Sequence, residues 1–488
     1  MLSKLKELSK DTAVYGISTV LARLLGFILI PFLTQFFTRD QMGIYGNIYA
    51  YIAFFNIIYI YGMDAAFLKY ASLSENKNLK DTFSTPYFFV FTTGLFFSVI
   101  LLALYQPISE IMKVPEHYSH LLIYMVFIIF FDTASIIPFA HLRLQRKSVK
   151  FAVIKIINIS LNLTMNIVLI WGLHADIDAI FISNLTASVI TFLILTPEIF
   201  KYLHFRIDTE ILKKMLKFGL PYLPAALAAT IVQVIDRPIL TYMTNEATVG
   251  VYTTNYKLGI SMMLFVGMFQ YAWQPFFLTN AKEKNAKEIF AKVLTLFMTV
   301  GSVILVLISL FVDNIASFNI YHGRTLIAHQ FLSGLPIVPI ILLSYLFNGM
   351  YLNFTAGIYI KEKMYAFPIA TGIGALSNVA VNLWLIPKMG IMGAAYATLI
   401  SYFAMCAILF YFTQKYYYIK YEFRKVFTIL GMIFTTGGVY YYLLYSGNLN
   451  LINKIIILFA FLFSLIIFRV IEKNEIIATY KILLRKNQ

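Results

Sequence analysis

Long apolar runs separated by short polar segments dominate the chain, and their lengths predict helices that cross a membrane. Most runs hold roughly 20–28 residues, which is enough to span a bilayer with some tilt. They are too long, and too uniformly apolar, for the alternating strands of a membrane barrel. We expect fourteen spans, at residues 11–37, 44–69, 83–106, 118–142, 150–171, 177–197, 217–243, 248–276, 290–313, 328–353, 365–386, 391–414, 425–445 and 451–471. The pattern therefore predicts an all-α polytopic membrane protein.

Lys and Arg residues gather in every second loop between these spans. The alternate loops hold only Arg39, Lys113, Arg324, Lys388 and Lys454. Cytoplasmic loops are rich in Lys and Arg, so both termini are predicted to be cytoplasmic. The net charge of +16 would suggest nucleic-acid binding in a soluble protein. Here the loop asymmetry accounts for it, and we expect no nucleic-acid partner.

The stretch from the first predicted span into the second shares Gly, Pro and Tyr positions with the stretch from the seventh into the eighth, at an offset of 207 residues. The matched pairs are Pro31 with Pro238, Gly43 with Gly250, Tyr45 with Tyr252, and Tyr49 with Tyr256. A second offset of 216 pairs Asn162 with Asn378 and Asn166 with Asn382. Because six spans separate the copies, both halves enter the membrane from the same side. This predicts a parallel repeat whose pseudo-twofold axis lies along the membrane normal.

The repeat and the polar segments together predict four parts of the chain. These are an N-terminal six-helix lobe at 1–200, an amphipathic cytoplasmic linker at 201–217, a C-terminal six-helix lobe at 218–415, and two additional transmembrane helices with a cytoplasmic tail at 416–488. The linker is assigned to the membrane surface because its apolar residues alternate with lysines and acids at helical spacing.

Four cations lie inside the predicted spans, and they are the first candidates for function. They are Arg23, Lys155, Arg237 and Lys257. A charge at this depth costs at least ~2.5–3.5 kcal/mol, so it usually faces a cavity or a partner. The donors of Arg and Lys suit phosphate oxygens. We therefore expect these residues to line a cationic cavity, with Lys155 also able to reach the headgroups.

Asp236 and Arg237 are neighbours, and on a continuous helix their side chains would point about 100° apart. We therefore expect each to find another partner, with Lys257 a candidate partner for Asp236. Pro238 removes a backbone donor and should kink the seventh span there.

Acidic and amide side chains inside the spans are candidates for ion coupling or for binding sugar hydroxyls. They are Asp132, Asp236, Asp64, Asn162, Asn378 and Asn382. Asp64 lies nearer the cytoplasmic edge, where it could pair with Lys69 or Arg143. The asparagines, together with Asn158 and Asn166, recur at i, i+4 spacing on single helix faces. They could equally hold helices together by hydrogen bonds.

No motif for an enzyme, a nucleotide or a metal stands out. The single cysteine, Cys406, excludes an intrachain disulfide and a cysteine-based zinc site. Neither a nucleophile–base arrangement nor a Walker loop is present. We expect no enzymatic activity and no bound cofactor, with coupling to a proton or sodium gradient left open.

Two stretches carry a family resemblance. The segment ARLLGFILIPFLTQFFTRDQMGIYGNIYAY, followed by GMDAAFLKY, resembles the opening signature of polysaccharide biosynthesis and export proteins. FGLPYLP, VIDRPIL, VGVYTTNYKL and QPFF resemble the corresponding signature in the second half. That family, with its Wzx-type flippases, belongs to the multidrug/oligosaccharidyl-lipid/polysaccharide exporter superfamily. The resemblance covers nearly the whole chain in span order.

The resemblance implies a flippase of the bacterial inner membrane that works by alternating access. Its substrate would be an oligosaccharide repeat unit on undecaprenyl pyrophosphate, used for O-antigen, capsule or exopolysaccharide, with a polymerase and glycosyltransferases as further partners. Other readings are a lipid II flippase, an ion-coupled multidrug antiporter, and a polysaccharide polymerase. The short external loops count against the polymerase, and the excess of intramembrane cations counts against the antiporter.

Overall fold

The computed structural model describes residues 28–73, 79–205, 207–321 and 324–470, and these parts of the chain are almost entirely helical. Residues 28–36 are helical. The first half continues with α2 (Arg39–Ile60), α3 (Met63–Leu73), α4 (Leu79–Ala103), α5 (Tyr105–Ile111), the 3₁₀ turn η2 (Glu116–Tyr118), α6 (Leu121–Leu144), α7 (Ser148–Ile167), the π-helical turn η3 (Val168–Gly172) and α8 (Asp178–Tyr202).

The second half begins with α9 (Thr209–Gly219), α10 (Tyr222–Val234), α11 (Asp236–Met243), α12 (Glu246–Leu258), α13 (Ile260–Asn280) and α14 (Ala286–Ala316). It continues with the short hairpin β1 (Asn319–Tyr321) and β2 (Arg324–Thr325), the 3₁₀ helix η4 (His329–Ile337), α15 (Val338–Ile360), α16 (Ala366–Met389), α17 (Ile391–Tyr416), α18 (Phe423–Tyr445) and α19 (Leu451–Ile467). The two strands pair antiparallel.

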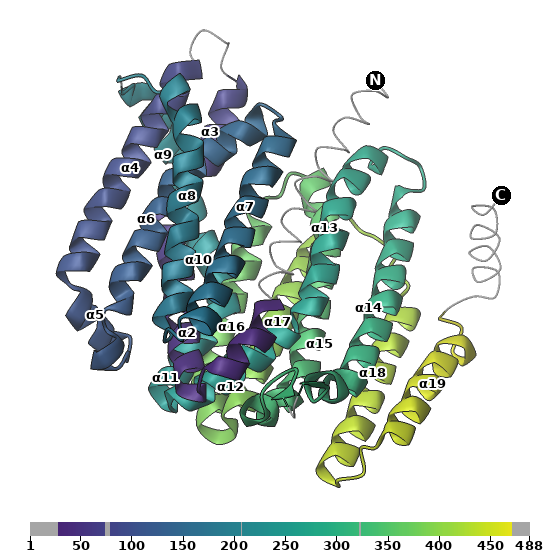
Figure 1. Ribbon diagram of the computed structural model, residues 1–488. Coiled ribbons are helices and arrows are strands. Elements are labelled where there is room, and N and C mark those ends of the chain that lie inside the picture. The colour runs from purple at the N-terminus through teal and green to yellow at the C-terminus, as the bar shows by residue number, and fades with distance from the viewer. Residues whose placement is uncertain (1–27, 74–78, 206, 322–323, 471–488) are drawn as a thin grey trace, which may run out of the picture.

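The helices form two groups, which converge at one end of the molecule (Figure 1). Helices α3 to α8 pack around α6, while α10 and α13 to α17 pack around α15 and α16. We call these the first and second lobes. Helices α2 and α12 lie against each other where the lobes meet. We call this contact the seam.

Helix length and composition support a multi-pass membrane protein. Within the described residues, ten helices are long and apolar enough to cross a membrane, or eleven if the bent pair α9–α10 counts as one span. Helix α19 is a shorter apolar helix of 17 residues. The all-α polytopic fold is therefore confirmed. The number of fourteen spans stays a prediction. Most of the predicted first span lies outside the described residues, the span at 248–276 is divided into α12 and α13, and α19 is shorter than the helices counted as spans.

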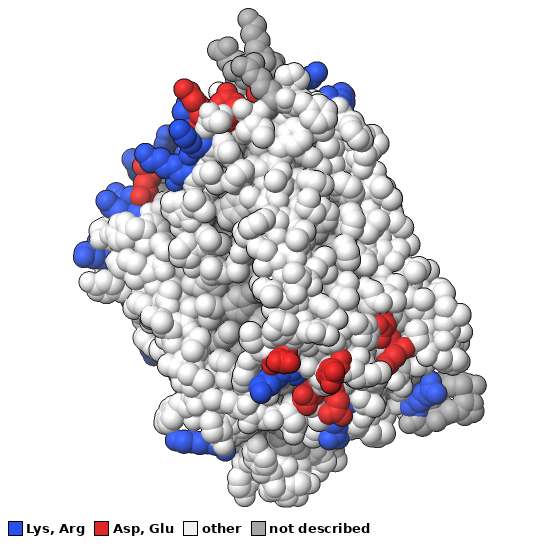
Figure 2. Space-filling view, turned by 90° about the vertical axis from the view of Figure 1, so that its left-hand side faces the viewer, with Lys and Arg blue, Asp and Glu red and all other residues white. Residues whose placement is uncertain are grey.

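Charged side chains are distributed as a membrane requires. Figure 2 shows them gathered toward the two ends of one face of the molecule, with a broad uncharged area between them. One end holds the starts of α4 and α7 and the end of α8, where Lys80, Lys147, Lys150 and Lys201 lie. We call it the basic end, and we call the opposite end, which contains the seam, the far end.

Three predicted spans are broken in the structure. The span at 44–69 is two helices, because Tyr61 and Gly62 adopt φ of 35° and 75°, outside the helical range. The span at 248–276 divides at Gly259 into α12 and α13. The span at 217–243 breaks at Ile235, three residues before Pro238. At that last division Ile235 keeps a helical φ of −65° and ψ of −22°, while Pro238 cannot donate to the carbonyl four residues earlier. The predicted kink stays a prediction.

Helix α9 occupies part of the predicted linker and is amphipathic as expected. The Asp208 carboxylate caps it by accepting hydrogen bonds from the backbone N–H groups of Glu210 and Ile211. Its apolar face, with Met215 fully buried, packs on α3 and α4 of the first lobe. The chain then bends by 42° into α10.

The seam is built from reciprocal glycine contacts. A Cβ atom on Gly43 would lie 1.9 Å from the carbonyl oxygen of Glu246, and one on Gly250 would lie 1.9 Å from that of Arg39. The offset of 207 residues that relates the two glycines also relates Arg39 to Glu246. The two helices therefore meet around a local two-fold axis, as the sequence repeat predicts.

Helices α18 and α19 attach to the second lobe through α14. At the far end, the Lys454 ammonium donates hydrogen bonds to Asp313 Oδ2 at 2.5 Å and to Asn314 Oδ1 at 2.6 Å. The Lys454 side chain is 2% exposed. An almost fully buried ammonium needs such partners, so this contact ties the start of α19 to the end of α14.

Replacement of Lys454 by methionine should loosen α19 while the two lobes stay folded. We expect a loss of about 1–3 kcal/mol, because the change removes two hydrogen bonds to a buried charge. Limited proteolysis of the 446–450 connection should become faster in Lys454→Met. The control Lys420→Met alters an exposed lysine and should leave proteolysis unchanged. Equal proteolysis of Lys454→Met and wild type would show that α19 is held by apolar packing alone.

Candidate functional site

Asp132 and Lys155 lie on neighbouring helices of the first lobe. The Asp132 carboxylate on α6 accepts a hydrogen bond from the Ser188 hydroxyl on α8 at 2.7 Å. The Lys155 ammonium on α7 lies within electrostatic range of Asp132 and 4.3 Å from the centre of the Phe139 ring. Asp132 is accessible although it sits midway along a membrane helix. The first lobe therefore holds a carboxylate and an ammonium close together at mid-helix depth, with the carboxylate exposed and the ammonium half-buried.

Asp64 and Arg143 continue this arrangement toward the basic end. The Asp64 carboxylate on α3 lies 4.0 Å from the Arg143 guanidinium on α6, which confirms one of its two predicted partners. Both side chains are about a third exposed, so the pair adds little stability. Arg143 is eleven residues from Asp132 on α6, or about 16 Å along the helix axis.

Tyrosines of α2 continue the arrangement toward the far end. The Asn184 amide donates a hydrogen bond to the Tyr49 hydroxyl at 2.8 Å, and Tyr49 lies within electrostatic range of Asp132. The rings of Tyr45 and Tyr49 are 4.6 Å apart. Neither tyrosine was a predicted site residue, although both belong to the repeated pairs of the sequence.

Lys257 completes the series from the other side of the seam. Its ammonium on α12 donates a hydrogen bond to the Tyr45 hydroxyl at 2.7 Å and lies 4.4 Å from the centre of the Tyr45 ring. We call the whole series the polar strip. It consists of Asp64, Arg143, Lys155, Asp132, Ser188, Asn184, Tyr49, Tyr45 and Lys257. It runs from the basic end to the seam and unites four predicted site residues.

The expectation that Asp236 and Arg237 do not pair with each other is wrong. Arg237 Nη1 donates a hydrogen bond to Asp236 Oδ1 at 2.8 Å and another to the carbonyl of Gln233, also at 2.8 Å. Both residues lie on α11, about 100° apart, and they pair because the long arginine side chain folds back toward Asp236 and Gln233. Asp236 is therefore neutralised by Arg237 and not by Lys257.

This ion pair is enclosed where α11 packs against α12. Asp236 is 1% exposed and Arg237 is 7% exposed. The guanidinium lies 4.3 Å from the centre of the Tyr256 ring, and the Tyr252 hydroxyl donates a hydrogen bond to Asp236. The arrangement joins α11 to α12. In this structure the pair is engaged by the protein itself, and a role for Arg237 in binding substrate stays a prediction.

The predicted asparagines form matching pairs within their own helices. Asn166 donates to the side chain of Asn162 at 3.1 Å on α7, and Asn382 donates to that of Asn378 at 2.7 Å on α16. Asn378 and Asn382 are fully buried. Asn158 instead links α7 to α8 through Thr191 and the carbonyl of Ala187. Asn158 therefore holds two helices together, as one of the two readings of the sequence expects.

Arg23, the remaining predicted cation, lies outside the described residues. Within the described ranges no group of three or more His, Cys, Asp or Glu side chains is placed to hold a metal ion.

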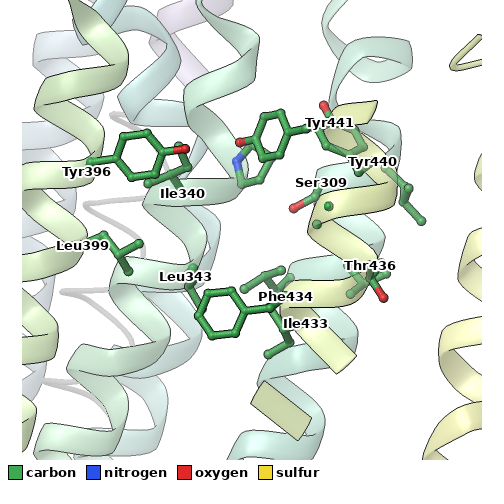
Figure 3. A pocket seen from close by; sticks show the side chains of 16 residues that line it. Ser309, Ile340, Leu343, Tyr396, Leu399, Ile433, Phe434, Thr436, Tyr440 and Tyr441 are labelled. Carbon is green, nitrogen blue, oxygen red and sulfur yellow. The ribbon is translucent and has the colours of Figure 1, made fainter. Parts of the chain in front are cut away.

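An apolar cavity of about 220 Å³ lies between α14, α15, α17 and α18 of the second lobe. Figure 3 shows Tyr396, Tyr440 and Tyr441 on one side of it, with Leu343 and Phe434 on the other. The Tyr441 hydroxyl donates a hydrogen bond to the carbonyl of Pro336. Its lining of aliphatic and aromatic side chains suits an apolar chain more than a sugar or a phosphate.

Comparisons with known proteins agree with this architecture. The sequence profile of a family described as "Polysaccharide biosynthesis protein" matches residues 32–298, more than half of the chain. A search of curated protein sequences finds no match.

Solved structures provide the second comparison. A lipid II flippase, MurJ, in an inward closed conformation, superposes with a TM-score of 0.73 at 17% identity, covering 94% of this chain and 99% of its own. An inward-facing multidrug resistance transporter of the MATE family, from the MOP superfamily, superposes with a TM-score of 0.61 at 14% identity, covering 84% of this chain and 93% of its own. At these identities the likeness concerns the fold.

Proposed function

This chain belongs to the polysaccharide biosynthesis protein family, and we propose that it flips undecaprenyl-pyrophosphate-linked oligosaccharide repeat units from the inner to the outer leaflet of the bacterial plasma membrane. The fold of a lipid II flippase over nearly the whole chain supports transport of a lipid-linked sugar. The sugar would follow the polar strip, whose hydroxyl, amide and carboxylate groups suit sugar hydroxyls. The lipid tail would stay in the bilayer, where the apolar cavity beside α18 offers it a surface.

Lys257 is the observation that carries the proposal. It is a half-buried cation at the seam, and within the described residues no carboxylate lies within ion-pair distance of it. A half-buried ammonium whose contacts are the neutral hydroxyl and ring of one tyrosine has spare capacity for an anion. The pyrophosphate of a lipid carrier supplies such an anion.

The charge distribution gives the proposed orientation. The basic end faces the cytoplasm under the rule that cytoplasmic loops are rich in Lys and Arg, and both termini are then cytoplasmic. Substrate would enter the strip near Asp64 and Arg143 and leave at the seam. The energy source is a proton or sodium gradient, or the concentrations of substrate and product. Glycosyltransferases and a polymerase would supply the cargo and consume it.

A lipid II flippase is the second candidate, because that structure covers 94% of this chain. Its cargo also carries a pyrophosphate, so Lys257 serves both readings. The multidrug antiporter reading fits less well, since the strip presents an unneutralised cation at the seam, which repels the cationic drugs that an acidic cavity would attract.

Replacement of Lys257 by glutamine should slow lipid exchange by roughly tenfold or more, because it removes a charge-assisted hydrogen bond worth about 1.5–3 kcal/mol. The measurement is leaflet exchange in proteoliposomes that contain a fluorescent undecaprenyl-pyrophosphate oligosaccharide, with fluorescent lipid II in a parallel sample. Lys420→Gln removes an exposed lysine and should leave the rate unchanged.

The outcomes of this assay separate the claims. Failure of the wild-type protein to exchange either lipid would refute the flippase. Faster exchange of lipid II than of the oligosaccharide lipid would favour the second candidate. A Lys257→Gln protein with the wild-type rate would remove Lys257 from the path.

A further inference from the structure

The seam closes the far end of the molecule by contacts that can separate without loss of backbone hydrogen bonds. At Gly43 and Gly250 the two helices touch through backbone atoms, and a Cβ at Gly46 would meet Thr253, again at the repeat offset of 207. These are van der Waals contacts between helices whose backbone groups are already paired within each helix. Opening the seam therefore leaves no helix backbone group unsatisfied.

Hydrogen bonds across the far end reinforce the closure. Three of them join neutral groups, and a fourth has a charged donor. Gln35 donates a hydrogen bond to the carbonyl of Thr325, Gln330 to that of Phe37, and Tyr242 to that of Ile111. These three bonds join neutral groups. The bond from Lys257 to Tyr45 crosses the seam itself, carries a charge, and lies at the end of the polar strip.

We propose that the seam is the outer gate of the transporter and that an anion arriving at Lys257 opens it. A phosphate oxygen accepts a stronger hydrogen bond from an ammonium than a neutral tyrosine hydroxyl does. The anion therefore replaces Tyr45 as the acceptor, and α12 loses the hydrogen bond that joins Lys257 to α2. The identity of the anion as a carrier pyrophosphate rests on the proposed function, whereas the gate itself does not.

We call the hydrogen bond between Lys257 and Tyr45 the latch. This mechanism explains why the latch joins the two halves of the repeat. Tyr45 belongs to α2 and Lys257 to α12, so one event at the cargo acts on both sides of the local two-fold axis. The position corresponding to Lys257 in the first half, at the offset of 207, is Ala50. The symmetric seam thus carries an asymmetric ionic latch.

Pulsed electron–electron double resonance, which measures the distance between two spin labels, tests the proposal on the full-length purified protein. Spin labels are placed on Asp40→Cys and Thr244→Cys, both exposed at the far end, in a Cys406→Ala background. Inorganic pyrophosphate is the probe. We expect a short distance in its absence and a second, longer distance in its presence. Lys257→Gln should abolish this response, while Tyr45→Phe should populate the longer distance without pyrophosphate.

The control is Lys388→Gln, which removes an exposed cation at the C-terminal end of α16. This variant should respond to pyrophosphate like the wild type. An unchanged distance distribution in the wild type, or an equal response in Lys257→Gln, would overturn the latch. Lipid exchange in the preceding assay without a pyrophosphate response would refute the latch and keep the flippase. A pyrophosphate response without lipid exchange would support the latch and refute the lipid-linked oligosaccharide as the transported substrate.

Discussion

Replacement of Arg237 by glutamine is expected to destabilise the protein by about 3–5 kcal/mol, because it leaves the Asp236 carboxylate buried without its cation. Asp236 is 1% exposed and is held by Arg237 and Tyr252. The double variant Asp236→Asn with Arg237→Gln should recover much of the loss, since neither side chain is then charged. The measurement is thermal unfolding in detergent, followed by size-exclusion chromatography after heating.

The matched control for this experiment is Arg424→Gln, which removes an exposed arginine at the start of α18. It should unfold at the wild-type temperature. A stable Arg237→Gln protein that no longer exchanges lipid would show the opposite of our expectation, with Arg237 serving the substrate and not the fold. The experiment thus decides between the structural role that the contacts indicate and the binding role that the sequence suggests.

Replacement of Gly43 by alanine is expected to prevent closure of the seam and to reduce lipid exchange at least tenfold. The added Cβ would lie 1.9 Å from the carbonyl oxygen of Glu246, well inside van der Waals contact. Backbone atoms of a packed helix cannot yield as a flexible side chain can, so α2 and α12 must move apart. The spin-label pair at Asp40 and Thr244 should then report the longer distance with or without pyrophosphate.

Gly372→Ala is the matched control for Gly43→Ala. Gly372 is also a helical glycine, on α16, and a Cβ there meets nothing within 4 Å. This change should leave the seam distance unchanged and stabilise the helix by roughly 0.5–1 kcal/mol. Wild-type distances and exchange in Gly43→Ala would mean that the seam does not have to close during transport.

The local pattern of the sequence predicted most helices closely. The expected span at 391–414 corresponds to α17 (Ile391–Tyr416), and the one at 365–386 corresponds to α16 (Ala366–Met389). The breaks were harder to foresee. Pro238 indicated the division at Ile235, because proline has no backbone N–H to donate within the helix. The division at Gly259 had no such signal, since glycine is tolerated within membrane helices.

The candidate site was predictable only in part. Its charged members, such as Lys155 and Asp132, stand out because charges are rare in apolar spans. Its hydroxyl and amide members, such as Ser188 and Asn184, do not, because these residues are common at helix contacts in membranes. The pairing of Asp236 with Arg237 was missed because it depends on the long arginine side chain folding back along α11, which angular spacing does not describe.

The sequence by itself determined the all-α membrane fold, the basic loops on one side and the repeat at an offset of 207 residues. These are properties of neighbouring residues and of regular spacing, and hydrophobic burial in a bilayer enforces them locally. Only the tertiary structure decided which charges have partners. Lys257 meets Tyr45 across 212 positions, and Asp132 meets Ser188 across 56. Such partners are chosen when helices pack side by side, and the order of residues along the chain does not specify that choice.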